Sequence, residues 1–129
     1  MKRHMCIIST LLMVFSSSLL PHIRARASLC TQVNMRLNEL LNAVKFAEAS
    51  TVVLVSHSNL LRALMGRRLH PSLRDEKPAL TQIAGAQKLK NCAIVRLELD
   101  FTQDLSNGVM ALEPMFVDQP EAAFLPPGK

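Results

Sequence analysis

Apolar residues recur along residues 28–50 at the spacing of one helix face. The stripe consists of Val33, Leu37, Leu40, Leu41 and Val44. These positions follow i, i+4, i+7, i+8 and i+11, and polar residues fill most of the positions between them. Ser28 or Thr31 can accept hydrogen bonds from the first turn and cap its start. The pattern predicts an amphipathic helix of about 16 residues.

The next apolar run is TVVLV at residues 51–55, and it has no polar alternation. Such a run is typical of a strand buried on both faces of a parallel sheet. Ser58 or Asn59 can cap a second helix, which Gly66 would end, with Arg67 and Arg68 near its C-terminus. Its inward stripe is Leu60, Leu61, Leu64 and Met65. Helix, strand and helix in this order predict an α/β fold with the strand at the centre of the sheet.

The remaining residues divide into three stretches. Residues 71–78 are polar and predict a loop, and residues 79–88 predict a short helix. Residues 92–101, CAIVRLELDF, alternate between apolar and polar positions, so we expect a strand near a sheet edge with one wet face. Residues 102–129 contain Asn-Gly and several prolines. They predict an irregular C-terminal tail.

Residues 1–27 combine a basic start, an apolar run and an Ala-x-Ala sequence before Ser28. This is the pattern of a secretory signal peptide, although Arg24 and Arg26 are unusual so close to a cleavage site. The apolar run, CIISTLLMVFSSSLL, is shorter than the roughly 20 residues of a membrane span. Three interpretations stay open: a signal peptide, a membrane anchor, or an apolar segment of neither kind, such as a buried strand. Localisation is accordingly either secretory or cytoplasmic.

Composition narrows the function classes. Hydrophobic residues make up 49% of the 129 residues, which is enough for a real core, whereas aromatic residues make up 4%. Four of the fifteen basic residues lie in residues 1–27, so the remainder is nearly neutral despite a net charge of +5. Neither observation favours nucleic acid as a partner. Cys6, Cys30 and Cys92 are widely spaced and predict free thiols, and no zinc site, other metal or cofactor is indicated.

His57 stands where the predicted buried strand meets the second helix. Ligands of open α/β sheets bind beyond the carboxyl ends of the strands, where a helix start offers unpaired N–H groups. The N–H groups of Ser58 and Asn59 and a protonated imidazole suit an anion such as a phosphoryl group. The alternative is a histidine that caps the helix or forms a buried hydrogen bond.

The segment VVLVSHSNLLRALMG resembles the second-histidine motif of the histidine phosphatase superfamily, the phosphoglycerate-mutase-like proteins. The matching positions are His57, Ser58, Asn59 and Arg62. The flanking sequences RLNELLNAV and KLKNCAIVRLELD resemble the family's preceding helix and closing strand, so the likeness spans residues 28–101. It implies a truncated three-layer α/β/α domain with a small, mostly parallel sheet and an edge strand.

The resemblance also implies roles for residues. In the family, a first histidine in an Arg-His-Gly motif attacks the phosphoryl group, and a second histidine stabilises the charge that develops. His57 would take the second role, Ser58 and Asn59 would bind phosphate, and Arg62 would be structural and form a sideways salt bridge or hydrogen bond.

The nucleophile half of the family pattern is missing. Arg3-His4 is followed by Met5 instead of glycine, and Arg24 lies too close in sequence to His57 to match a family phosphate ligand. Three acidic residues, Glu48, Asp75 and Glu76, are expected on the solvated surface, so no general acid can be nominated. We expect His70, Arg67 and Arg68 on the surface as well.

Three hypotheses follow. The chain is an inactive fragment of a histidine phosphatase, or a non-catalytic module that binds a phosphorylated small molecule, a phosphoprotein or a protein partner. The third is an active enzyme completed by another chain. An apolar sheet edge left by missing strands would also favour self-association.

Overall fold

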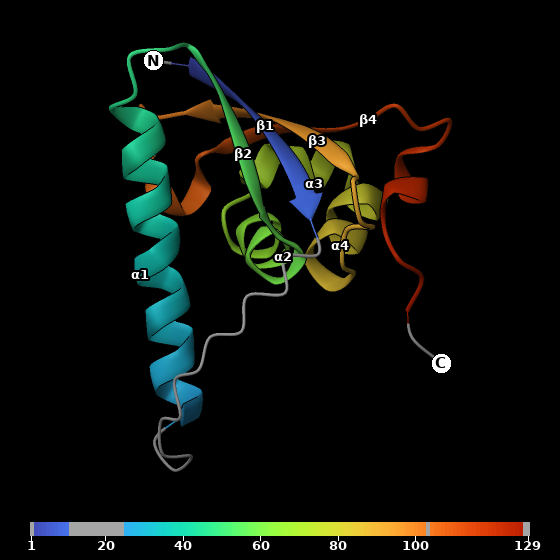
Figure 1. Ribbon diagram of the computed structural model, residues 1–129, viewed down its shortest axis with the longest axis horizontal. Helices are drawn as coiled ribbons and strands as arrows, with labels where there is room; N and C mark the ends of the chain where they lie inside the picture. The colour runs from blue at the N-terminus through green and yellow to red at the C-terminus, as the bar shows by residue number, and fades with distance from the viewer. Residues whose placement is uncertain (1, 11–24, 103, 128–129) are drawn as a thin grey trace.

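The computed structural model describes residues 2–10, 25–102 and 104–127 (Figure 1). Strands alternate with helices along most of the chain, which confirms the α/β class. The elements, in chain order, are β1 (Lys2–Thr10), α1 (Ala25–Lys45), β2 (Thr51–His57), α2 (Ser58–Arg67), α3 (Pro71–Glu76), α4 (Pro78–Ala86), β3 (Ile94–Asp100), η1 (Leu105–Asn107), β4 (Val109–Met115) and η2 (Pro120–Ala123).

The four described strands form one mixed sheet in the order β2-β1-β3-β4. β1 runs parallel to β2 and antiparallel to β3, and β3 runs antiparallel to β4. The expected mostly parallel sheet is therefore not what the described strands form. β2 lies at an edge instead of the centre, and β3 lies inside the sheet instead of near its edge. Local periodicity indicates which face of a strand is buried, but it does not indicate which strands are its neighbours.

β1 forms from the beginning of the segment that resembles a signal peptide. The side chains of Met5 and Ile7 are fully buried in the core. The guanidinium of Arg3 donates a hydrogen bond to the carbonyl of Ala49, in the turn between α1 and β2. For residues 2–10, this structure corresponds to the third interpretation of the segment, a buried strand, and the folded unit includes them. No helix in the described part of the chain has the length and apolar character to cross a membrane.

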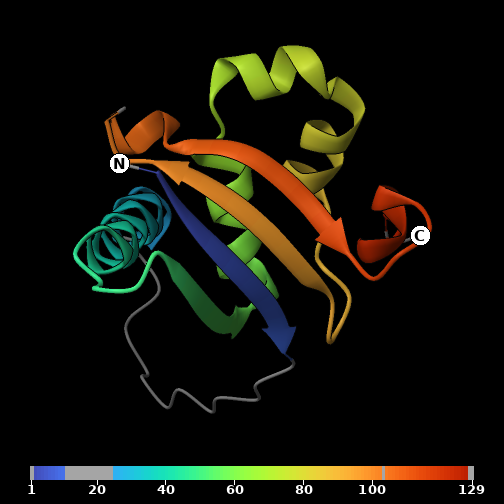
Figure 2. The same cartoon turned by 90° about the horizontal axis from the view of Figure 1, so that it is seen from above.

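The sheet is covered by described helices on one face. Figure 2 shows α2 and part of α4 behind the strands, with α3 beyond β4. On the covered face, Leu37 and Leu41 of α1 and Leu61 and Leu64 of α2 are buried in the same cluster as the inward residues of the sheet. No second helical layer, as a three-layer fold requires, is found among the described residues. The helices and the sheet here make two layers.

The opposite face of the sheet carries charged side chains on β1, β3 and β4, whereas on β2 it carries exposed valines. Val53 and Val55 on β2 are 62% and 56% exposed, so β2 is not buried on both faces as its sequence predicts. Farther across the sheet, this face carries an ion pair between Lys2 and Glu98 with an N–O distance of 3.2 Å. A second ion pair joins Arg96 to Glu113.

Helices α2 and α4 approach closely because glycines meet at their crossing. A Cβ atom added to Gly85 would lie 3.3 Å from the Cα atom of Gly66. Such a contact is tighter than helices with larger residues allow, so these glycines bring the two backbones together. Gly66 therefore lies inside α2, which ends one residue later at Arg67, and is not its terminating residue.

Several local predictions are corrected by the structure. α1 begins at Ala25, so Ser28 and Thr31 lie within the helix instead of at its start. Residues 71–76 form α3 instead of a loop, since Pro71 occupies the first turn, where its missing N–H costs nothing. The short helix α4 and the strand β3 are confirmed.

The expected irregular tail contains a strand. β4 pairs with β3, and its residues Val109 and Leu112 are buried. Pro114 argued against a strand in the sequence. Proline is nevertheless compatible with an edge strand, because half of the backbone N–H groups of such a strand have no partner in the sheet. Beyond β4, Ala123 and Phe124 also pack into the core.

The burial of β1 predicts that its inward residues contribute strongly to stability. Ile7→Ala should lower the free energy of unfolding by about 2–5 kcal/mol, because it opens a cavity in the core. Val53→Ala on the exposed face of β2 should lower it by less than about 1 kcal/mol. Equilibrium unfolding in urea measures both changes. Equal losses for the two variants would contradict the central, buried placement of β1.

Candidate functional site

His57 is both the last residue of β2 and the N-cap of α2. Its backbone is extended, with φ −84° and ψ 140°, and its Nδ1 accepts a hydrogen bond from the backbone N–H of Asn59 at 3.4 Å. The residue is exposed. An imidazole that accepts at Nδ1 carries its proton on Nε2 when it is neutral, so the assigned hydrogen bond leaves an N–H donor on the other side of the ring.

The carboxyl ends of β1 and β2 lie side by side at the same edge of the sheet. Their parallel register pairs Ser9 with Ser56 and Thr10 with His57. Carboxyl ends of adjacent parallel strands are the usual location for ligands in open α/β sheets. The backbone of β1 therefore ends next to the residue that begins α2.

Ser58 and Asn59 form the first two positions of α2, and the side chain of neither caps the helix. The sequence predicted one of them as the N-cap, but the imidazole of His57 takes that role. The first N–H groups of a helix have no partners within the helix. Because the bond from Asn59 to His57 is long, it is weak, and an anion could replace the imidazole as its acceptor.

His4 lies at the far end of the sheet from His57. It pairs with Thr51, at the amino end of both strands, while Thr10 pairs with His57. Six residues of strand separate the two ends, which corresponds to about 20 Å. His4 therefore cannot act on a group bound at His57. Arg24, the other residue considered as a phosphate ligand, lies outside the described residues.

Arg62 differs from its expected role. It makes no hydrogen bond or ion pair with the part of the chain that the structure describes, so the predicted sideways partner is not found there. Instead it lines a groove over α2 together with Asn59, one turn earlier. The sequence around Arg62 does not indicate this groove, because its sides come from α1 and α4, which are distant from α2 in the sequence.

The other basic candidates have structural roles. His70 is the N-cap of α3, and its Nδ1 interacts with the hydroxyl of Ser72 at 2.7 Å and with its backbone N–H at 3.2 Å. Arg67 donates to the side-chain oxygen of Asn34 at 3.0 Å, which connects α2 to α1. Arg68 is buried, at 8% exposure, where the sequence predicted a surface residue.

No group of three or more His, Cys, Asp or Glu side chains that could hold a metal ion occurs in the described ranges. Comparisons with protein-family models, with curated proteins and with solved structures found no match. The resemblance to histidine phosphatases therefore rests on the sequence around His57 and its flanks. The relationship is therefore a hypothesis.

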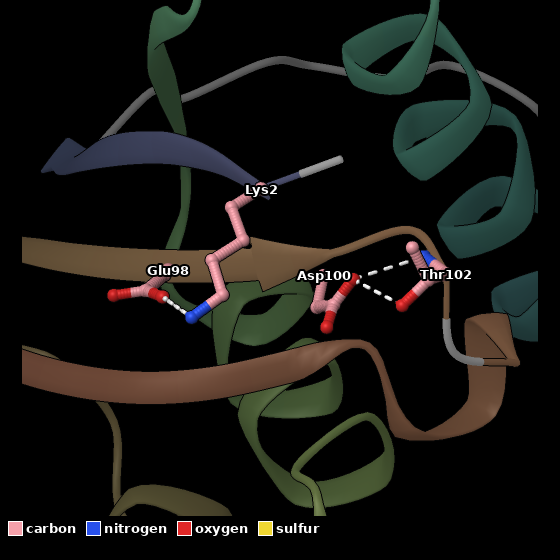
Figure 3. A network of polar contacts seen from close by, with 4 residues as sticks. All are labelled: Lys2, Glu98, Asp100 and Thr102. Atoms are coloured by element: carbon pink, nitrogen blue, oxygen red, sulfur yellow. Dashed lines mark hydrogen bonds and ion pairs between the residues drawn. The ribbon is translucent and has the colours of Figure 1, made fainter.

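The carboxylates with clearly shifted pKa values lie away from His57. Figure 3 shows Asp100, at the end of β3, accepting from the hydroxyl of Thr102 at 2.7 Å and from its backbone N–H at 3.0 Å. These hydrogen bonds, that from the hydroxyl above all, lower the pKa of Asp100. Asp104 has a lowered pKa for the same reason, because Ser106 donates to it through its hydroxyl and its backbone N–H.

The pKa of Asp100 should rise toward its ordinary value in Thr102→Val, which removes the hydroxyl donor. Because the folded-state pKa is depressed, the carboxylate stabilises the fold above its unfolded pKa of about 3.9, and this contribution is lost as pH falls through the folded value. Carbon NMR of the carboxyl group against pH measures the change. Ser106→Ala is the control and should move Asp104 alone. A shift of Asp100 in the control would contradict this assignment.

Proposed function

We propose that this chain is a phosphate-binding protein related to the histidine phosphatases, with the second-histidine position at His57 and without the nucleophile half. The observation that carries the proposal is the exposed imidazole at the carboxyl end of β2, beside the carboxyl end of β1 and at the start of a ten-residue helix. This is the arrangement expected for the second histidine. It also suits an anion by its own chemistry, whatever the family.

Binding would exchange one acceptor for another. In the ligand-free arrangement the imidazole accepts from the N–H of Asn59. A phosphoryl oxygen can accept this N–H together with that of Ser58, in place of the imidazole. The partial positive charge of the helix N-terminus favours this exchange.

Catalytic turnover requires a nucleophilic histidine, which the described carboxyl end of β1 does not contain. In the family, a histidine at the end of the opening strand forms the phosphoenzyme, whereas Ser9 and Thr10 occupy the end of β1 here. Loss of a covalent nucleophile removes several orders of magnitude in rate, while an anion site retains binding. We therefore infer a binding function without catalysis for the chain alone.

The alternative function is a protein-binding module that uses the edge of the sheet. β2 contains no charged residue, proline or bulge of the kind that protects edge strands, and Val53 and Val55 are exposed on it. In contrast, the opposite edge strand, β4, carries Pro114 and Glu113. This observation favours strand addition at β2, including self-association, as the second candidate.

Inorganic phosphate should perturb the ring signals of His57 in proton–nitrogen NMR spectra, because the anion replaces the imidazole as the acceptor of the Asn59 N–H. His57→Ala should weaken phosphate binding by about fivefold or more, measured by titration of the backbone signals of Ser58 and Asn59. His70→Ala is the matched control, since His70 also caps a helix through Nδ1. Equal effects of the two substitutions would sink the proposed site.

Restoring the family motif in register should create a phosphoenzyme. The triple variant Ser9→Arg, Thr10→His, Leu11→Gly places the arginine and the histidine of an Arg-His-Gly sequence at the last two positions of β1, with the new histidine paired to His57. Incubation with p-nitrophenyl phosphate should label this variant with acid-labile phosphohistidine, because the nucleophile now adjoins the anion site.

The unmodified chain and the triple variant with an added His57→Ala should remain unlabelled. Turnover by the unmodified chain that is abolished by His57→Ala would instead support an active enzyme and refute a purely binding role. Failure of the triple variant, with phosphate binding intact, would argue against the family relationship while leaving the anion site in place.

A further inference from the structure

A groove runs over the outward face of α2, between α1 and α4. The residues that α2 contributes are spaced as one helical stripe: Asn59, Arg62, Ala63, Gly66 and Arg67. Val33 of α1 forms one side, and Gly85 and Ala86 of α4 form the other. Its volume is about 570 Å³, within the range of specific ligand sites and far larger than a single ion needs.

A second hollow of about 430 Å³ adjoins the first and shares Arg62 and Ala86 with it. Its other lining residues come from the chain after α4 and from the C-terminal segment: Gln87, Lys88, Leu125, Pro126 and Pro127. Arg62 therefore stands at the junction of two hollows. Together they form one elongated depression, which we name the α2 groove.

The charges along the α2 groove have a single sign. Arg67, Arg62 and Lys88 line it in that order, and no Asp or Glu is among the described residues that line either hollow. Arg67 is partly engaged by Asn34. Arg62 makes no hydrogen bond or ion pair with the described residues, so its five N–H donors are available to a carboxylate.

The floor of the α2 groove is low and uncharged between these cations. Ala63, Gly66, Gly85 and Ala86 present little or no side chain, and Leu125 with two prolines adds an apolar wall. An occupant can therefore bring its backbone close to α2 while apolar side chains contact the wall. These are the requirements of an extended peptide and not of a compact anion.

We propose that the α2 groove binds an extended acidic segment of a partner protein, with carboxylates at alternate positions and apolar side chains between them. Arg62 and Arg67 lie at opposite margins of the α2 stripe, because five residues of helix correspond to a rotation of about 140°. A segment that lies between them can present carboxylates to both guanidinium groups, and a further carboxylate can approach Lys88.

This site is separate from the proposed phosphate site, although Asn59 borders both. His57 does not line the α2 groove. Peptide binding and phosphate binding can therefore fail independently. His57→Ala is expected to leave peptide affinity unchanged, and this separates the two proposals.

Fluorescence anisotropy of the full chain with a labelled Gly-Glu-Leu-Glu-Leu-Glu-Gly peptide tests the inference. Arg62→Glu should weaken binding at least about tenfold, because it places a like charge at the centre of the α2 groove. Lys88→Glu provides a second variant and should weaken binding by about threefold or more. Arg36→Glu is the matched control, an exposed arginine on α1 outside the groove, and should change affinity less than about twofold. Circular dichroism confirms that each variant is folded.

Three outcomes would overturn the inference. The first is equal affinity for a peptide with glutamine in place of glutamate. The second is an equal loss of affinity in Arg36→Glu and Arg62→Glu, which would indicate a nonspecific effect of net charge. The third is displacement of the peptide by a single-stranded oligonucleotide at the same charge concentration, which would indicate a general polyanion surface.

Discussion

Parallel hydrogen bonding between β1 and β2 determines where His57 lies relative to the end of its neighbouring strand. Two parallel strands end at the same edge of a sheet, so the register that pairs Thr10 with His57 also places His4 at the opposite edge. Met5 and Ile7 hold β1 in the centre of the sheet by burying their side chains. The position of His57 beside another strand end thus depends on the core as much as on its own sequence.

Periodicity in the sequence was sufficient where an element has one buried face. The apolar stripes of α1 and α2 and the alternation of β3 predicted these elements, and the strand-to-helix junction at His57 was predicted from residues 51–66. β1 was ambiguous because the apolar run of a signal peptide and a buried strand have the same local composition. The order of the strands could not be predicted from the local pattern of residues. An apolar run such as TVVLV does not indicate whether one neighbouring strand or two will pair with it.

The candidate site was likewise only partly predictable from the sequence. Its location follows from a histidine after an apolar strand, but the choice of N-cap depended on a side-chain conformation that the spacing of residues does not reveal. Here the imidazole of His57 accepts from the N–H of Asn59 and caps the helix, whereas the side chains of Ser58 and Asn59 do not. Arg62 was expected to be structural because a sequence does not show that α1 and α4 would form the sides of a groove around it.

One short helix supports both proposed sites. The first turn of α2 supplies the N–H groups near His57, and the next two turns supply the floor of the α2 groove. The close approach of Gly66 and Gly85 packs α2 directly against α4, so both surfaces lie on one packed pair of helices. A partner on the groove and an anion at the helix start would therefore experience the same positive field, which arises from the helix N-terminus and the arginines that follow.

The central position of β1 also has a consequence for how the chain acquires its structure. Met5 pairs with Val52 on one side and with Leu97 on the other, so both neighbours of the first strand are synthesised long after it. Contacts at such long sequence separation are slow to form and leave the early strand without partners on the ribosome. We expect the nascent chain to depend on chaperones until β3 has emerged, and the last steps of folding to be limited by the insertion of β1 between β2 and β3.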